Sequence, residues 1–443
     1  MIASVISLGC PKNLIDSELI LGNLVRAGFI LTDSIEKADL VIINTCAFIQ
    51  PAVTEAKNKI QEILTYKKKG IIQKIFVAGC LVQRFQKNLE KEYPEIDGFF
   101  GIDYLHEIPQ CWEKKPIKKT FVCTPQDIST SYEPRLLSTP HHYAYLKIAD
   151  GCDNHCSYCL LPSIRGRYRS REIEDVVREA KMLAKSGVKE LILVAQDTTF
   201  YGQDRYHKPM LSQLLHKLNQ IKSFIWIRLL YTHPAHFNDE LIKAIAKLPR
   251  VAKYVDLPLQ HISDRLLARM NRKVTRLDIE RLLTKLRKID RLVLRTSFIV
   301  GFPSETEKDF TELCDFIREQ KFDHLGCFTY YQEKGSLAYS FRNQIPEKVK
   351  IERFNELMKL QKSISRQLLF RFRGRKVKVL IDALSQRKGY NYVGRTEGDA
   401  PEIDGLVYVN GKNIEPGDLV MVEIKKSSAY DLFGEIVSVP QSG

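Results

Sequence analysis

The chain has 443 residues, with 68 Lys or Arg against 53 Asp or Glu, so its formal net charge is +15. A hydrophobic fraction of 44% and a charged fraction of 27% are typical of a globular protein and exclude wholesale disorder. The basic balance favours an anionic partner, with nucleic acid or a ribonucleoprotein ahead of an anionic membrane surface.

Ten cysteines in a chain of this length are too few for a small disulfide scaffold. No run of about 18 apolar residues occurs, so we expect no membrane-spanning helix. The first residues lack the basic start and continuous apolar stretch of a signal peptide. We therefore expect a cytoplasmic monomer, in which clustered cysteines act as metal ligands or catalysts.

Residues 1–123 alternate short apolar runs with helix-like segments, which is the rhythm of βαβ units. The expected strands are Val5–Leu8, Leu40–Ile43 and Lys74–Ala78, and the expected helices include Leu14–Arg26 and Thr54–Tyr66. Short apolar runs of this kind are typical of strands buried in a parallel sheet. We expect a doubly wound α/β domain here, followed by a Ser-, Thr- and Pro-rich linker over residues 124–139.

Residues 140–370 repeat the strand and helix pattern about six times. The expected strands are Ala144–Ile148, Leu191–Val194, Trp226–Leu230, Tyr254–Leu257, Leu292–Ile299 and Leu325–Phe328. The expected helices include Ile173–Ser186, Met210–Ile221, Glu307–Glu319 and a long closing helix over Lys348–Phe370. This pattern predicts a full or partial (β/α) barrel, with its chemistry at the carboxyl ends of the strands.

Residues 371–443 change to short strands separated by turns that contain Gly and Asp. The expected strands are Lys376–Ile381, Leu406–Tyr408, Leu419–Ile424 and Phe433–Val437. The pattern predicts a small all-β barrel. Over residues 374–443, ten acidic residues outnumber nine basic ones, so the basic surface should lie on or around the middle domain.

Cys152, Cys156 and Cys159 form a C-x3-C-x2-C motif directly after the first predicted barrel strand. Three thiolates this close in sequence can hold three irons of a 4Fe–4S cube and leave the fourth iron free for a substrate. Zinc ribbons favour two C-x2-C pairs, and no second pair follows, so zinc is the weaker alternative. Three unrelated core cysteines are a weaker alternative still.

Cys10, Cys46 and Cys80 each lie just past a predicted parallel strand of the N-terminal domain. The carboxyl ends of such strands line one crevice, so three cysteines far apart in sequence can converge there. A single cysteine at such a place would be a small buried hydrophobe. Three at equivalent places favour a metal or cluster site, and the glycines before Cys10 and Cys80 fit a close backbone approach.

The C-x3-C-x2-C motif is the signature of the radical S-adenosylmethionine (SAM) superfamily, which the middle domain resembles. Combined with the three-cysteine N-terminal domain and a terminal module similar to the TRAM domain, it makes nearly the whole chain resemble the methylthiotransferase family. The resemblance implies α/β architecture with a partial barrel and two 4Fe–4S clusters. One cluster, on Cys152, Cys156 and Cys159, would cleave SAM. The other, on Cys10, Cys46 and Cys80, would carry or deliver sulfur.

The same resemblance implies further SAM contacts. Tyr158 takes the place of an aromatic residue that flanks the adenine, and Gln196 and Asp197 take places near the SAM amino group. Gly301 and Glu305, in FIVGFPSE, resemble a glycine-and-acid motif near the adenine, although Glu305 comes one residue later than the usual spacing. A tight strand-to-helix turn is the plain alternative for this segment.

Members of this family differ in their substrates. The local sequence here resembles that of the branch that modifies an aspartate of ribosomal protein S-twelve. The matching segments are ISLGCPKNLIDSE, INTCAFI, IADGCDNHCSYCLLPSIRGRYRSR, VAQDTTFYGQD, DLPLQH and GRTEGDAPEIDG. The implied reaction replaces a hydrogen on the aspartate β-carbon with a methylthio group, and requires an external electron donor and a sulfur donor. Modification of adenosine in tRNA is the first alternative, and a non-catalytic iron–sulfur ribosome-binding protein is the second.

Charge gives a separate argument on the partner. A module that grips RNA should be basic, whereas residues 397–404 contain four acids and no Lys or Arg. An acidic face would suit a basic ribosomal protein as the partner, in a ribosomal context, and would not favour tRNA. The alternative is that these residues form an ordinary solvated acidic loop.

Two further sets of residues are candidates without a settled role. Asp256, Gln260 and His261 are candidates to line the substrate pocket, with a structural histidine as the alternative. Four alternating arginines follow the cysteine loop and either face RNA, substrate or SAM or stabilise the fold: Arg165, Arg167, Arg169 and Arg171.

Overall fold

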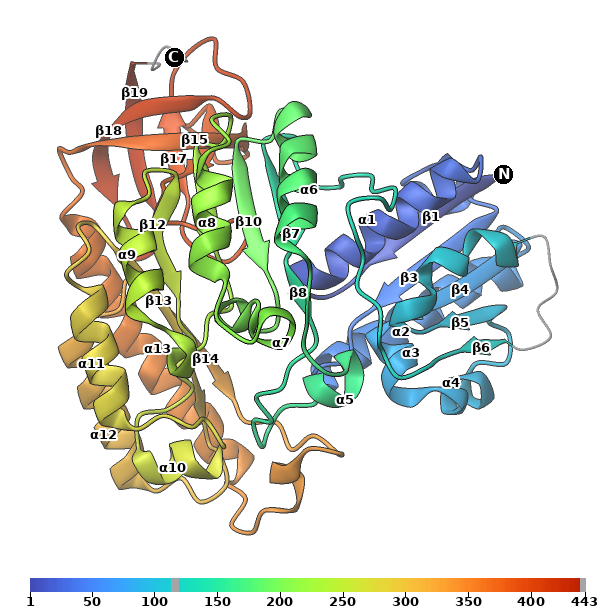
Figure 1. Ribbon diagram of the computed structural model, residues 1–443, viewed down its shortest axis with the longest axis horizontal. Helices are drawn as coiled ribbons and strands as arrows, with labels where there is room; N and C mark the ends of the chain where they lie inside the picture. Colours follow the sequence, from blue (N-terminus) through green and yellow to red (C-terminus); the bar gives the residue numbers. More distant parts are fainter. Residues whose placement is uncertain (113–118, 439–443) are drawn as a thin grey trace.

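The protein folds into three sheet-based parts (Figure 1), seen here in a computed structural model that describes residues 1–112 and 119–438. The expected domains 1–123 and 371–443 therefore each include some residues outside the described part of the chain. None of the described helices is long and apolar enough to cross a membrane.

The N-terminal part is a six-stranded parallel sheet in the order β2-β1-β3-β4-β5-β6. Its strands are β1 (Ile2–Ser7), β2 (Ile30–Leu31), β3 (Leu40–Thr45), β4 (Lys74–Gly79), β5 (Gly98–Phe100) and β6 (Thr120–Phe121). Its helices are α1 (Pro11–Arg26), α2 (Gln50–Lys68), α3 (Cys80–Phe85) and α4 (Lys87–Glu92). The doubly wound α/β prediction is confirmed.

The register of this sheet aligns the carboxyl ends of its central strands. Ser7 of β1 pairs with Asn44 of β3, and Thr45 of β3 pairs with Gly79 of β4. The three strands therefore stop at one edge, and each is followed within a few residues by a cysteine.

The middle part is a six-stranded parallel sheet in the order β14-β13-β12-β11-β10-β7, which is a partial rather than a closed barrel. Its strands are β7 (Tyr143–Lys147), β10 (Glu190–Val194), β11 (Trp226–Leu229), β12 (Val251–Asp256), β13 (Val293–Val300) and β14 (His324–Thr329). The short pair β8 (Ala149–Asp150) and β9 (Arg169–Ser170) brackets the cysteine loop. The six predicted strands are all present, with ends shifted by a few residues.

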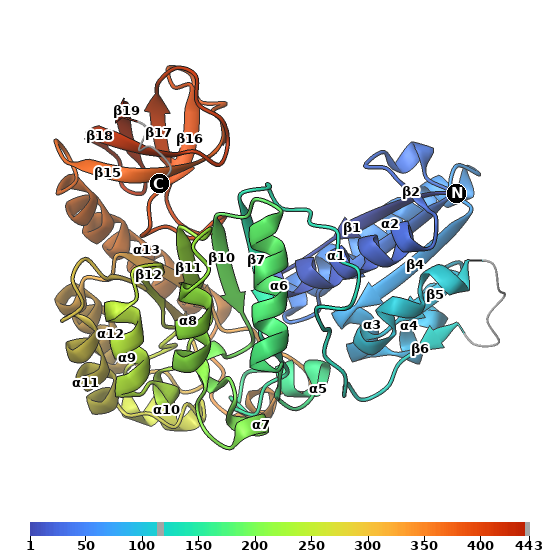
Figure 2. The ribbon, with the colours of Figure 1, turned by 45° about the horizontal axis from the view of Figure 1, so that its top comes forward.

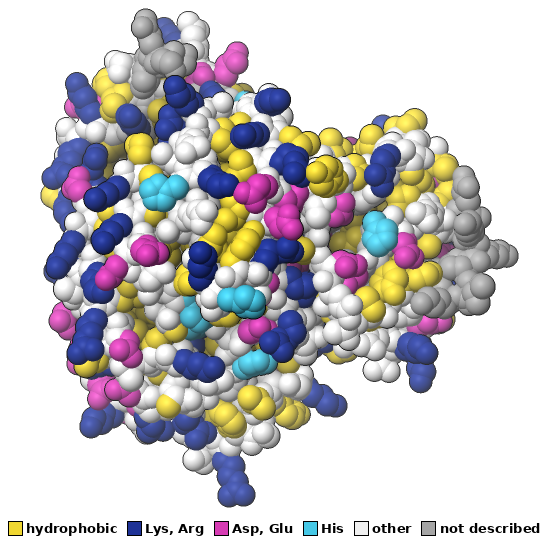
Figure 3. Space-filling view, in the orientation of Figure 1, with side chains coloured by type: hydrophobic (Ala, Val, Ile, Leu, Met, Phe, Trp, Pro, Cys, Tyr) yellow, Lys and Arg dark blue, Asp and Glu magenta, His cyan; other side chains and the backbone are white. Residues whose placement is uncertain are grey.

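Helices cover the outer face of this partial barrel (Figure 1). They are α6 (Ile173–Lys185), α8 (Leu211–Asn219), α9 (Asp239–Lys247), α11 (Arg276–Leu286), α12 (Glu307–Gln320) and α13 (Glu347–Phe370). Three short helices lie in connecting loops: α5 (Leu161–Arg165), which packs against the core of the N-terminal part, α7 (Gln203–Tyr206) and α10 (Asp264–Arg269). Figure 3 shows Lys and Arg side chains spread over α8, α9 and α11 among acidic ones, consistent with the basic middle domain expected from the sequence.

The inner face of the partial barrel is covered by the other two parts of the chain. Aromatic side chains of its strands, including Tyr145, Trp226 and Tyr254, form one buried cluster with residues of two other elements. Ile15 comes from α1, and Ala400 comes from the C-terminal part. Figure 2 shows this arrangement, with the N-terminal sheet beside β7 and the C-terminal barrel at the ends where β10–β12 begin.

The C-terminal part is a closed five-stranded barrel in the order β15-β16-β17-β19-β18. Its strands are β15 (Lys376–Leu384), β16 (Tyr392–Arg395), β17 (Val407–Asn410), β18 (Leu419–Ser427) and β19 (Leu432–Ser438). The all-β barrel prediction is confirmed, although β16 was not among the expected strands.

The acidic segment 397–404 does not form the exposed acidic face that charge counting suggested. Asp404 is 2% exposed and accepts hydrogen bonds from the Tyr254 hydroxyl at 2.7 Å and from Arg295 at 3.3 Å. A Glu397 carboxylate oxygen accepts the Lys253 backbone N–H at 2.8 Å. The segment instead joins the C-terminal barrel to the middle sheet, because its acids pair with groups of that sheet.

Candidate active site

The first three cysteines meet at the carboxyl edge of the N-terminal sheet. Cys10 precedes α1, Cys46 follows β3, and Cys80 begins α3. Gly9 has a φ of 96°, and a Cβ placed there would lie 2.6 Å from the Cys46 Cβ. Only glycine permits so close an approach, because a side chain at that point would collide with Cys46.

Burial dominates the electrostatics of this triad, as it does for Cys314 outside it. Burial raises the pKa of Cys80 to about 12, Cys46 and Cys10 add to the increase, and Arg165 opposes it. Burial likewise raises the pKa of the Cys46 thiol. Such thiols become thiolates at neutral pH only when a cation compensates them, and a bound metal centre is the strongest such cation.

The second triad lies in the loop that follows β8. Cys152 donates its backbone N–H to the Gly166 carbonyl at 3.1 Å, and the Cys159 N–H binds the Cys156 carbonyl at 3.0 Å. Burial raises the pKa of the Cys152 thiol to about 11. N–H donors aim at two of the sulfurs: Leu161 N lies 3.4 Å from the Cys159 Sγ, and Arg272 Nη1 lies 3.7 Å from the Cys156 Sγ.

Donors of this kind are what thiolate ligands of an iron–sulfur cluster accept, so the residues present fit such a group. Among the described residues, only Asp197, His233 and His236 bring three candidate ligand atoms within 4.8 Å of one another. Neither cysteine triad is that compact.

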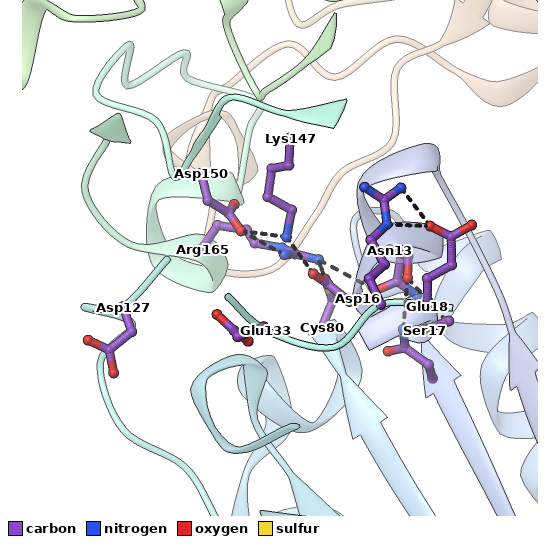
Figure 4. Close-up of polar contacts among 12 residues, drawn as sticks. Asn13, Asp16, Ser17, Glu18, Cys80, Asp127, Glu133, Lys147, Asp150 and Arg165 are labelled. Atoms are coloured by element: carbon purple, nitrogen blue, oxygen red, sulfur yellow. Dashed lines mark hydrogen bonds and ion pairs between the residues drawn. The ribbon is translucent and has the colours of Figure 1, made fainter. Parts of the chain in front are cut away.

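A buried ionic network lies beside Cys80 of the first triad and crosses the boundary between the two domains (Figure 4). Arg165 of α5 donates to Asp150 at 3.0 Å and, across the domain boundary, to Asp16 of α1 at 2.7 Å. Its Nη2 also lies 3.4 Å from the Cys80 Sγ. Lys147 of β7 completes the network by contacting Asp16 and Asp150.

The same network continues toward the second triad. The Asp150 Oδ1 accepts the Gln196 side-chain amide at 2.7 Å and the Gly151 N–H at 2.9 Å. Cys152 is the next residue. Burial raises the pKa of Asp150, but Arg165 and Lys147 outweigh it and hold this pKa below its ordinary value. A continuous run of polar contacts thus leads from Cys80 to the cysteine loop.

Comparison with known families accounts for nearly the whole chain. Residues 146–317 match the radical SAM superfamily, residues 3–101 match the uncharacterized protein family UPF0004, and residues 374–437 match the TRAM domain. A ribosomal protein uS12 methylthiotransferase RimO from Pelotomaculum thermopropionicum is 48% identical over 98% of both chains. RimO proteins of Desulforamulus reducens and Myxococcus xanthus are 45% and 43% identical and cover 97% and 98% of this chain, and 98% and 91% of their own.

The chain belongs to the RimO family of methylthiotransferases. It is therefore a radical SAM enzyme, whose cofactors include an iron–sulfur cluster and SAM. Solved structures support the fold. The radical SAM methyltransferase TsrM from Kitasatospora setae aligns with a TM-score of 0.56 at 16% identity over 74% of each chain. OxsB aligns with a TM-score of 0.53 at 13% identity over 82% of this chain and 56% of its own.

In this RimO-family chain, several SAM-contact candidates gather around the second cysteine loop. The Asp197 carboxylate accepts the Asn154 side-chain amide of that loop at 2.8 Å and pairs with His236 at 2.7 Å. The pKa of Asp197 falls to about 2, because hydrogen bonding to His236 and neighbouring groups outweighs the effect of burial. Tyr158 lies in the loop itself and packs against the buried group that contains Phe302 and Tyr330.

Gly301 and Glu305 form a locked turn after β13. Glu305 accepts the backbone N–H groups of Gly301 at 2.8 Å and Phe302 at 3.3 Å, and it pairs with Arg353 at 2.8 Å. Burial raises the pKa of Glu305 to about 7. The Glu305 carboxylate thus stabilises its own turn through these hydrogen bonds. This favours the interpretation that the segment is a tight strand-to-helix turn.

The three substrate-pocket candidates separate in the structure. Asp256 accepts the Tyr231 N–H at 2.8 Å and pairs with Arg295 at 3.2 Å, so it lies near the first triad. Gln260 has a φ of 71° and is partly buried beyond β12. His261 is fully buried, its Nδ1 accepts the N–H groups of Ile262 and Ser263, and its Nε2 lies 3.8 Å from Glu305. That position gives no support to substrate contact by His261.

The four alternating arginines also differ. Arg165 and Arg171 are buried in ion pairs, so they stabilise the fold. The Arg167 side chain is 84% exposed beside Asp153, and Arg169 donates to backbone carbonyls. The sequence interpretation missed Lys12, Asp16 and Tyr231, because their contacts cross between domains. The one available signal was that Lys12 and Asp16 closely follow Cys10.

Proposed function

We propose that this chain attaches a methylthio group to the β-carbon of an aspartate in ribosomal protein uS12. The names of relatives that are 43 to 48% identical over nearly their full length support this substrate. The main structural support is the Arg165 network, which crosses the domain boundary from Cys80 of one triad to Asp150, two residues before Cys152 of the other. A simple radical SAM enzyme would need only the second triad.

Within this proposal, each triad holds a 4Fe–4S cluster. Cys152, Cys156 and Cys159 leave one iron for SAM, and the N-terminal triad leaves one iron of the second cluster for sulfur. When bound, these groups supply the radical that removes a hydrogen atom from the β-carbon and the methylthio sulfur that replaces it. A radical is needed because a C–H bond at that carbon has no useful acidity.

The protein's own side chains position the reacting groups and exclude water from them. Asn154, Asp197 and Gln196 order the polar wall of the SAM site, and the buried network around Arg165 keeps the second triad facing the first. The aromatic inner face of the barrel excludes water around the reacting carbon. An external electron donor and a sulfur donor complete the reaction, because none of these side chains supplies electrons.

Mass spectrometry of uS12 tests the proposal. The enzyme, reconstituted without oxygen, is incubated with uS12, SAM, sulfide and reductant. The expected result is a gain that matches a methylthio group in place of hydrogen on one aspartate. Methylthio product on tRNA, with none on uS12, would overturn the substrate assignment. Absence of 5′-deoxyadenosine with either substrate would overturn the radical chemistry.

A further inference from the structure

Lys12 is a buried lysine at the junction of the two domains, and no carboxylate of the described residues contacts its ammonium group. It stands two residues after Cys10 in the first turn of α1 and is 8% exposed. Its Nζ lies 3.3 Å from the centre of the Tyr231 ring. Within the described part of the chain, Lys12 forms no ion pair. A ring face offsets only part of the cost of burying an ammonium group, so a carboxylate brought to Lys12 would gain a charge-assisted contact.

The nearby carboxylates are already committed elsewhere. The charged and titratable groups that act on Lys12 are Cys10, Arg165, Asp150 and Asp256. Asp150 is taken by Arg165 and Lys147. Asp256 is taken by Arg295 and by the backbone N–H of Tyr231. Neither acid reaches the Lys12 ammonium.

The ring that faces Lys12 is held in an unusual conformation. Tyr231 follows β11 with a φ of 59°, a left-handed backbone that bulky residues rarely adopt. Its N–H bond to Asp256 and the hydrogen bond from Thr198 N to its carbonyl at 2.9 Å fix that conformation. Strain of this kind concentrates at binding sites. Lys12 from one domain and Tyr231 from the other thus form one wall beside Cys10.

We propose that Lys12 binds the side-chain carboxylate of the aspartate that this enzyme modifies. The inference rests on the proposed function. In aspartate the carboxylate is bonded directly to the β-carbon, so a cation beside Cys10 that holds it also fixes the reacting carbon next to the N-terminal triad. The charge-assisted hydrogen bond makes Lys12 a specificity-determining residue. The side-chain amide of asparagine and an uncharged nucleobase carry no negative charge that could pair with the Lys12 ammonium group.

The test compares Lys12→Gln and Lys12→Arg with the unaltered enzyme, on uS12 and on uS12 whose target aspartate is changed to asparagine. Reconstituted holoenzymes are assayed for methylthio product, 5′-deoxyadenosine and iron. The unaltered enzyme should prefer the aspartate protein. Lys12→Gln should lower kcat/KM for it by roughly 10- to 100-fold and remove the preference. Iron should stay unchanged. Lys12→Arg keeps the charge and should keep the preference.

Lys69→Gln is the matched control, because Lys69 is exposed and also lies over a ring, with its Nζ 6.0 Å from the centre of Tyr66. No product on uS12 from the unaltered enzyme would overturn the proposed function and this inference together. Product formation with an unchanged preference in Lys12→Gln would overturn this inference alone. Loss of the preference in Lys12→Arg, at full iron content, would also overturn it.

Discussion

Arg165 of the middle domain donates to Asp16 of the N-terminal domain at 2.7 Å, with both side chains almost fully buried. Changing Arg165→Met leaves Asp16 and Asp150 with Lys147 as their remaining cation. Removing one partner of a buried ion pair leaves the other charge, here on the carboxylates of Asp16 and Asp150, only partly compensated. We therefore expect the free energy of unfolding to fall by about 3 kcal/mol. Urea denaturation under anaerobic conditions measures the change.

Arg167→Met is the control for this prediction. The Arg167 side chain is 84% exposed and pairs with Asp153 in solvent. Exposed pairs of this kind contribute little, so the variant should unfold together with the unaltered protein. Equal denaturation midpoints for the two variants would show that the Arg165 network does not stabilise the domain junction.

Glu305→Gln should change how stability depends on pH. Burial raises the pKa of Glu305 in the folded protein to about 7, above its ordinary value of 4.5. The folded state therefore binds more protons than the unfolded state between these values, and the stability of the unaltered protein falls as pH rises through this window. Glutamine cannot ionise and avoids the loss.

The stability of Glu305→Gln relative to the unaltered protein should thus improve by on the order of 1 kcal/mol from pH 6 to pH 8. Denaturation curves at the two pH values measure the difference. A relative stability that is the same at both values, or that moves in the opposite direction, would contradict the raised pKa.

Asp404→Ala should weaken the joint between the C-terminal barrel and the middle sheet. The change leaves the Tyr254 hydroxyl and the Ala400 N–H without their acceptor and removes one of two carboxylates from Arg295. Unpaired buried donors make a loss of about 2 kcal/mol the expected result, measured by urea denaturation. Glu415→Ala, at an exposed position of the same barrel, should change little. Equal effects would mean that Asp404 is not a structural link.

Cys80→Ser should remove one cluster and leave the other. We expect about half of the iron to be lost on reconstitution, while 5′-deoxyadenosine still forms, because the second triad remains intact. Cys123→Ser controls for general effects of losing a thiol, since Cys123 is exposed and outside both triads. Full iron content in Cys80→Ser would remove the N-terminal triad from the proposed mechanism.

Much of the fold follows from local patterns in the sequence. Buried parallel strands are short apolar runs, so β3, β4 and the barrel strands were predictable within a few residues. The convergence of Cys10, Cys46 and Cys80 was predictable too, because parallel strands of a common register end at a common edge. By contrast, β2, β5 and β6 have three residues or fewer, too short to show a period, and β16 includes Gly394 and Arg395, which interrupt its apolar run.

Contacts between domains could not be predicted in the same way. The acids of residues 397–404 suggested an exposed face, because composition counts charges without showing their partners. Asp404 accepts hydrogen bonds from Arg295 and Tyr254, which are each more than a hundred residues away in the sequence. Lys12 and Tyr231 are separated by more than two hundred residues and belong to different domains. Nothing in the local sequence around either residue indicates the other.

The open barrel takes part of its interior from its neighbours, through Ile15 of α1 and Ala400 of the C-terminal barrel. A change of side-chain volume at either residue therefore alters the packing of the barrel interior. A hybrid enzyme that exchanged either terminal part between distant relatives would carry a mismatched core rather than a new specificity. Exchanging substrate preference should need changes inside the junction, at single side chains, and not the transfer of a whole module.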